Sequence, residues 1–133
     1  MKRDMDLIRE LLLKLEALPI RQGGVVHITL DENDPDDDLR VEGFTTDQIE
    51  YHLNLIDEAG LIVGAGNRPM SGILFRSLSW EGHDFLDSIR DPEVWRKTRN
   101  GVKEVGGFTF ELVKDLAKGF VKKQIEDKTG ITL

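Results

Sequence analysis

The sequence predicts a mixed α+β domain followed by a helical extension, and three observations favour this. Apolar residues recur at helical spacing in several segments, one β-branched run suits a strand, and glycines cluster between two apolar stretches. The 133 residues are 39% hydrophobic, enough to bury a core without disulfides. We place the mixed domain at residues 1–90 and the helical extension at residues 91–133.

The first predicted element is a helix that begins after Asp4, a good capping residue, and ends before Pro19. Its apolar residues repeat at helical spacing: Leu7, Ile8, Leu11, Leu12, Leu15 and Leu18. A strand is expected next, over residues 25–30, because this run is rich in β-branched side chains.

An acidic segment follows, with six Asp or Glu among residues 31–38. If residues 39–43 form a second strand, this segment is the solvated loop of a hairpin. One helical turn started by Asp34 and Pro35 is the alternative. The charge density also suits docking of a basic partner.

Spacing within the acidic segment resembles a calcium-binding loop only in part. Candidate oxygen ligands stand at its first, third, seventh and twelfth positions: Asp31, Asn33, Asp37 and Glu42. Pro35 stands at the fifth position, however, and Asp36 replaces the glycine that the loop needs for its sharp turn. We therefore predict no metal site here.

The next helix is expected from Thr45, which forms a capping box with Gln48, to Ala59, where Gly60 suits a left-handed cap. Helical periodicity divides its residues between two faces. The core face holds Ile49, His52, Leu53, Ile56 and Ala59. The solvent face holds Asp47, Glu50, Tyr51, Asn54, Asp57 and Glu58, and these six are our candidate interaction residues.

A hairpin is expected to follow, in which residues 61–63 pair with residues 72–78 across a glycine-rich tip. Ser79 then caps a short helix that carries Phe85, Leu86 and Ile89.

Two more helices complete the prediction. The first begins at Asp91-Pro92-Glu93, with Val94, Trp95, Thr98 and Val102 facing inward. Gly106-Gly107 then breaks the chain, and Thr109 opens a long helix that ends near Lys128.

The last helix carries an apolar face that spans more than half of its circumference: Phe110, Leu112, Val113, Leu116, Ala117, Phe120, Val121 and Ile125. Covering so wide a face requires more than one neighbour, which predicts a homodimer through this helix. Beside it, Lys114, Lys118 and Lys122 form a basic ridge at i, i+4 spacing. Interspersed acidic residues argue against a membrane-surface helix.

The order of helix, strand, helix, glycine-rich hairpin and helix resembles the winged-helix regulators of bacteria. The step Ala59-Gly60-Leu61-Ile62 and the motif Ser79-Trp80-Glu81-Gly82 carry this resemblance. It implies a recognition helix at residues 46–59 and a wing at residues 61–78. The support helix that should precede the recognition helix is missing, because the acidic segment occupies its place.

Three shorter stretches are similar to an uncharacterised domain family of bacteria and their phages. These are Met1-Lys2-Arg3-Asp4-Met5-Asp6-Leu7-Ile8-Arg9, Tyr51-His52-Leu53 and Trp80-Glu81-Gly82-His83-Asp84-Phe85-Leu86. This resemblance implies no activity.

Charge bears directly on whether DNA is the partner. Four carboxylates and no Lys or Arg stand on the solvent face of the expected recognition helix, where they would repel phosphates. We therefore predict a protein-interaction module. The alternative is a DNA-binding regulator that uses Arg68 and Arg76 of the wing region with Lys114, Lys118 and Lys122.

The sequence offers no convincing catalytic or cofactor-binding pattern. His27, His52 and His83 lack zinc-ligand spacing, and the glycine-rich segment lacks the Lys and Ser or Thr of a phosphate loop. The chain has no Cys and no run near the ~20 apolar residues that cross a bilayer. We expect a cytoplasmic, non-enzymatic protein without a cofactor.

Overall fold

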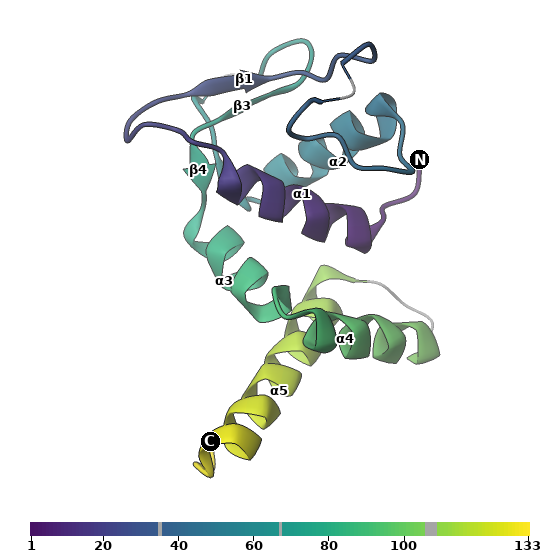
Figure 1. Ribbon diagram of the computed structural model, residues 1–133, viewed down its shortest axis with the longest axis vertical. Coiled ribbons are helices and arrows are strands. Elements are labelled where there is room, and N and C mark those ends of the chain that lie inside the picture. The colour runs from purple at the N-terminus through teal and green to yellow at the C-terminus, as the bar shows by residue number, and fades with distance from the viewer. Residues whose placement is uncertain (35, 67, 106–108) are drawn as a thin grey trace. The chain divides into compact units, whose positions relative to one another are not determined.

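The computed structural model describes residues 1–34, 36–66, 68–105 and 109–133. Its described part is a mixed α+β structure with five helices and two small sheets of two strands each. The elements in chain order are α1 (Met5–Ala17), β1 (Val26–Ile28), α2 (Thr46–Glu58), β2 (Ile62–Val63), β3 (Ile73–Phe75), β4 (Ser77–Leu78), α3 (Trp80–Ile89), α4 (Pro92–Val105) and α5 (Phe110–Thr129) (Figure 1).

The chain divides into two compact units, Met1–His83 and Asp84–Leu133. The division falls within α3, earlier in the chain than the boundary we expected after residue 90.

In the first unit, α1 begins as predicted, since the Asp4 side chain accepts a hydrogen bond from the Leu7 amide. The leucine and isoleucine face of α1 is buried, although Leu18 lies past its end and is only half-buried. α1 packs on α2, and the Asp4 amide donates to His52 Nε2 on α2 at 2.8 Å. The two helices therefore share a hydrogen bond as well as an apolar contact.

The capping box of α2 is present, with the Thr45 side chain bonded to the Gln48 amide and the Gln48 side chain bonded to the Thr45 amide. Gly60 has φ +74°, the left-handed conformation expected after this helix. The predicted core face is buried except at Ala59, where the prediction is wrong. Ala59 is the C-cap, so its side chain lies past the last packed turn.

The sheets differ from the predicted hairpin. Only β4 pairs with β2, joining Ile62 to Leu78, whereas β3 pairs with β1 in the register Val26 to Phe75 and Ile28 to Ile73. The expected second strand over residues 39–43 is wrong, because these residues form turns. Leu39 is buried in the core, so the segment between β1 and α2 is anchored without a strand.

The second unit contains the packed helices α4 and α5 (Figure 1). All four residues predicted to face inward from α4 are buried: Val94, Trp95, Thr98 and Val102. At its start, hydrogen bonds from the Val94 and Glu93 amides hold the pKa of the Asp91 carboxyl below its ordinary value of 3.8. The predicted break at Gly106-Gly107 lies outside the described residues.

α5 begins after Thr109 as predicted and ends with Gly130 as its cap, slightly later than expected. Its apolar face is covered only in part. Val113 and Ala117 are buried, whereas Leu112 is 48% exposed and Ile125 is 42% exposed. α5 therefore keeps apolar side chains in contact with solvent.

Candidate interaction surface on the second helix

None of the six candidate interaction residues of α2 is buried. Asp47, Tyr51 and Glu58 are exposed, and Glu50, Asn54 and Asp57 are partly exposed. The edge of the Tyr51 ring meets the buried His52 ring, with 5.5 Å between centroids. We refer to these six residues as the acidic face: Asp47, Glu50, Tyr51, Asn54, Asp57 and Glu58.

Arg68, in the connection between β2 and β3, is held against the end of the acidic face. Its Nε lies 3.4 Å from Asp57 Oδ2 and its Nη1 lies 3.8 Å from Glu58 Oε1. The arginine is 57% exposed, so each pair is weak on its own. The contact nevertheless places the guanidinium beside two carboxylates, where its charge is balanced before any phosphate approaches.

The acidic face also continues toward β1 through hydrogen bonds. Glu50 Oε1 accepts from the Leu30 amide at 3.2 Å, just past the end of β1. Thr46 Oγ1 at the start of α2 donates to Glu32 Oε1 at 3.2 Å. The acidic segment that follows β1 is therefore joined to α2, and the two acidic regions form one continuous part of the first unit.

Arg40 organises this acidic segment from within. Its Nε donates to the Asp34 carbonyl oxygen at 3.0 Å, and its Nη2 donates to the Asp31 and Glu32 carbonyl oxygens at 2.9 and 3.2 Å. Three carbonyls thus converge on a guanidinium in the region where we considered a calcium loop. No group of three or more metal-ligating side chains is present in the described ranges.

Several carboxylates of the segment bind its own backbone. Asp31 Oδ1 accepts from the Asn33 amide at 2.8 Å, and Asp37 Oδ1 accepts from the Leu39 amide at 3.0 Å. Such turns are a frequent use of aspartate in loops. The segment is a hydrogen-bonded structure rather than the open hairpin loop that we expected.

Two of the three histidines have structural partners. His52 Nε2 accepts from the Asp4 amide, so its Nδ1 carries the hydrogen donated to the Gln48 carbonyl oxygen at 2.7 Å. His27 Nε2 lies 2.9 Å from the Ser71 carbonyl oxygen. His83 is exposed. These positions give no zinc-binding set.

The basic candidates of the DNA-binding alternative are distributed over both units. Arg68 and Arg76 belong to the first unit, and Arg76 is exposed. Lys114, Lys118 and Lys122 belong to the second unit, with Lys114 Nζ 5.9 Å from the centre of the Phe110 ring. The structure thus brings Arg68 to the acidic face and leaves Arg76 in solvent.

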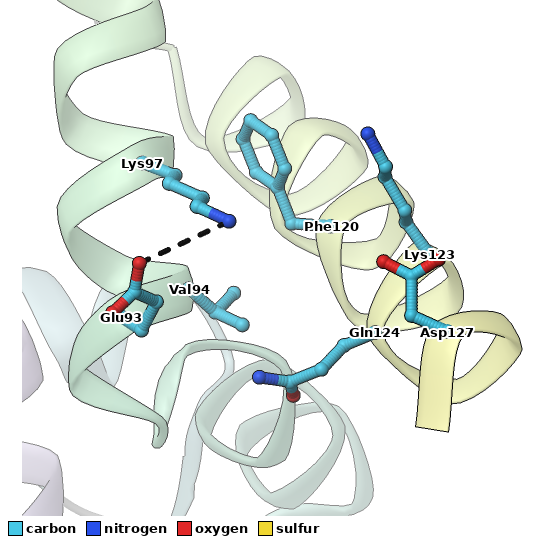
Figure 2. A pocket seen from close by; sticks show the side chains of 7 residues that line it. All are labelled: Glu93, Val94, Lys97, Phe120, Lys123, Gln124 and Asp127. Atoms are coloured by element: carbon cyan, nitrogen blue, oxygen red, sulfur yellow. Dashed lines mark ion pairs between the residues drawn. The ribbon is translucent and has the colours of Figure 1, made fainter. Parts of the chain in front are cut away.

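A cavity of about 180 Å³ lies between α4 and α5 (Figure 2). Val94 and Phe120 supply apolar walls, while two amines and two carboxylates supply its charges. One of these pairs, Glu93 with Lys97, is an ion pair at 3.9 Å. Balanced charges over an apolar wall make a small amphipathic pocket and provide no nucleophile with an adjacent base. The full lining is Glu93, Val94, Lys97, Phe120, Lys123, Gln124 and Asp127.

Two further hollows lie among the described residues of the first unit. One, of about 180 Å³, is lined by apolar residues of α1, β3 and β4, with Glu16, Arg76 and His83 among its polar residues. The other is an open depression of about 650 Å³ beside Asp36, Asp37, Asp38 and Phe44. Within the described ranges, no helix is long and apolar enough to cross a membrane.

The protein has a mixed α+β fold with an acidic face on α2. Comparison with known proteins places it in a family. Residues 2–109 match the family described as "Hypothetical protein (DUF2513)", and the chain belongs to this family. The match ends at Thr109, the cap of α5.

A relative from Haemophilus influenzae (strain ATCC 51907 / DSM 11121 / KW20 / Rd) is 30% identical over 128 residues. The alignment covers 94% of this chain and 99% of the relative, which is described as "Uncharacterized protein". No solved structure matches the chain. The resemblance to an uncharacterised family is thereby confirmed.

Sequence reasoning missed Arg40, and it named Arg68 as a candidate nucleic-acid contact without predicting its ion pairs with α2. Arg40 follows a run of six carboxylates by two residues, and this proximity was a usable signal for a local partner. No such signal existed for the contact of Arg68 with Asp57 and Glu58, because these residues lie on opposite sides of β2 in the sequence and meet only in the folded chain.

Proposed function

We propose that this protein is a non-enzymatic, winged-helix-like interaction module that binds a basic protein partner through the acidic face. The winged-helix description is supported by the order α1, β1, α2, β2, β3, β4, α3 and by the pairing of β1 with β3. Residues 29–34 and 36–44 contain turns where a support helix would stand.

One observation carries the choice of partner: the acidic face holds Arg68. A surface that already binds a guanidinium through Asp57 and Glu58 has the charge and the geometry for basic side chains of another protein. In the DNA-binding alternative, Arg68 would have to leave these two carboxylates to reach a phosphate, and four carboxylates of α2 would remain beside the backbone.

The dimer remains part of the proposal. The exposed Leu112 and Ile125 of α5 support it, because a second copy could cover them. Bacterial or prophage origin is proposed from the similarity to the uncharacterised family alone, and the cytoplasmic location stays a prediction from the sequence.

The test is binding of a fluorescent Lys/Arg-rich peptide to the full chain, followed by anisotropy. In the test variant Asp57→Asn/Glu58→Gln, we expect the affinity to fall on the order of tenfold, since two attractive charges are lost and Arg68 is released. The control variant Asp87→Asn/Glu93→Gln removes the same charge and likewise removes ion pairs to arginine, those with Arg90 and Arg96.

Equal losses of affinity in the two variants would mean that net charge alone attracts the peptide, and the acidic face would then have no special role. A loss confined to the α2 variant supports the proposal.

A further inference from the structure

Among the described residues, one edge of the strand β1 has no strand beside it. The strand pairs with β3 on one side, and the described residues form no further strand on its other side. Val25 and Val26 are 40% and 38% exposed. An exposed edge strand presents unpaired N–H and C=O groups that can pair with another extended chain.

The geometry identifies which backbone groups face outward. A Cβ on Gly72, which precedes β3, would overlap the Ile28 carbonyl oxygen, so that carbonyl points toward β3. In an antiparallel pair, successive residues direct their N–H and C=O groups to opposite edges. The N–H and C=O groups of His27 therefore face away from β3. If the same alternation continues into the residues that flank β1, Val25 and Thr29 also present outward groups, at the two-residue spacing that strand addition uses.

This edge lacks the charges that natural proteins use to protect edge strands. Residues 22–30 contain no Asp, Glu, Lys or Arg, although charged residues make up 32% of the chain. Six acidic residues follow immediately, in the segment 31–38. The edge is thus uncharged along the strand and strongly negative just beyond its end.

We propose that the free edge of β1 binds an extended segment of a protein partner by strand addition, with Lys or Arg residues of that segment lying over the acidic segment. This inference rests on the proposed function and specifies its partner. Main-chain hydrogen bonds to Val25, His27 and Thr29 hold the added strand, and charge fixes its register.

Charge also selects this occupant over a second copy of the chain. Residues 1–83 hold eight Lys or Arg and sixteen Asp or Glu, a net charge of −8. Two such units repel when their β1 edges approach, whereas a basic segment is attracted. The acidic face adjoins the end of β1, because Glu50 of α2 accepts a hydrogen bond from the Leu30 amide there. A basic segment added to β1 would therefore lie close to the acidic face as well.

The test begins with selection of binders to the full chain from a displayed library of random peptides. The expected binders alternate apolar and polar residues and carry Lys or Arg at one end. The best binder is then synthesised in two forms. One carries N-methyl groups on its odd-numbered residues and the other on its even-numbered residues. Strand addition predicts that one form loses affinity on the order of tenfold or more and the other does not.

A protein variant gives an independent readout. Val25 precedes β1 and is not one of its paired residues, so Val25→Pro removes the N–H that we infer to face outward and leaves the pairing of β1 with β3 in place, while Val25→Thr keeps this N–H. We expect only the proline variant to lose peptide affinity, with both variants retaining the wild-type unfolding transition. Hydrogen exchange in the complex is expected to slow at residues 25–29.

Each alternative outcome has a definite meaning. Suppose that basic binders lose affinity for Asp57→Asn/Glu58→Gln, but that neither N-methylated form of the peptide nor the Val25→Pro variant changes the affinity. This result would overturn strand addition, while the acidic face would keep its role. A selection that yields no alternating, basic-ended binder would also overturn the inference. Binders that respond to Val25→Pro alone would support the edge and contradict the acidic face as the main surface.

Discussion

Arg68 Nε lies 3.4 Å from Asp57 Oδ2, so the connection between β2 and β3 turns its arginine toward α2. Arg68 also lies 3.8 Å from Glu58 Oε1, and both contacts are solvent-exposed. Exposed ion pairs contribute little to stability. The contact of Arg68 with Asp57 and Glu58 therefore affects the charge that this surface offers to a partner more than it affects the stability of the fold.

This gives a prediction for Arg68→Ala. We expect its free energy of unfolding to change by less than about 1 kcal/mol, because the pairs are exposed and screened by solvent. Affinity for a basic peptide should rise, since Asp57 and Glu58 lose their internal partner. Urea unfolding and anisotropy measure the two quantities, and a fall in peptide affinity would argue against competition at this position.

Gly82 is predicted to tolerate no side chain. The Ser79 side chain bonds both the Gly60 carbonyl oxygen and the Gly82 amide, drawing α3 against the turn after α2. A Cβ on Gly82 would overlap the Leu61 carbonyl oxygen. We expect Gly82→Ala to destabilise the protein by roughly 1–3 kcal/mol in urea unfolding, despite the better helix propensity of alanine.

Gly119→Ala is the matched control for this substitution. Gly119 lies within α5, and a Cβ there meets nothing within 4 Å. Its replacement should stabilise the protein by up to about 1 kcal/mol. Similar changes in the two variants would show that helix propensity, rather than contact with Leu61, decides the outcome.

Arg40 is expected to control the order of the acidic segment. In Arg40→Ala, three carbonyl oxygens lose their shared donor, so amide exchange in residues 31–44 should accelerate. Arg40→Lys should rescue this only in part, because an ammonium group lacks the planar fork of donors. The control is Arg76→Ala at an exposed arginine outside the segment, and equal acceleration in it would contradict the assignment.

Asp91 gives a pH-dependent prediction. Its folded-state pKa is lowered, chiefly by the Val94 and Glu93 amides, so its contribution to stability is present above the ordinary value of 3.8. This contribution is lost as the pH falls through the lower folded-state pKa. Asp91→Asn keeps a capping oxygen but no charge, so the melting temperatures of the two proteins should converge as pH falls below 3.8. A constant difference would exclude this linkage.

Local signals predicted much of the fold, and long-range pairing was not predictable from them. Caps at Asp4, Thr45 and Thr109 fixed three helix starts, because each depends on hydrogen bonds within one turn. Strand partners depend on distant residues. The run after Gly72 therefore divides between β1 and β2, with β3 pairing to one and β4 to the other, where we expected one hairpin.

The same distinction applies to the candidate surface. Helical periodicity identified the exposed side of α2, since exposure there follows from the position of the core. It gave no indication that Arg68 would reach Asp57, or that Glu50 would bind the amide of Leu30. Those contacts join segments that meet only when β1, α2 and the loop after β2 have packed together.

The most direct test of the central claim is anisotropy of a fluorescent mixed-sequence DNA duplex titrated with the wild-type protein at low and moderate salt. The acidic face should repel the phosphate backbone, so we predict no saturable binding even at low salt. Tight binding that weakens steeply with salt and again in Arg68→Ala would contradict the account and establish the DNA-binding alternative.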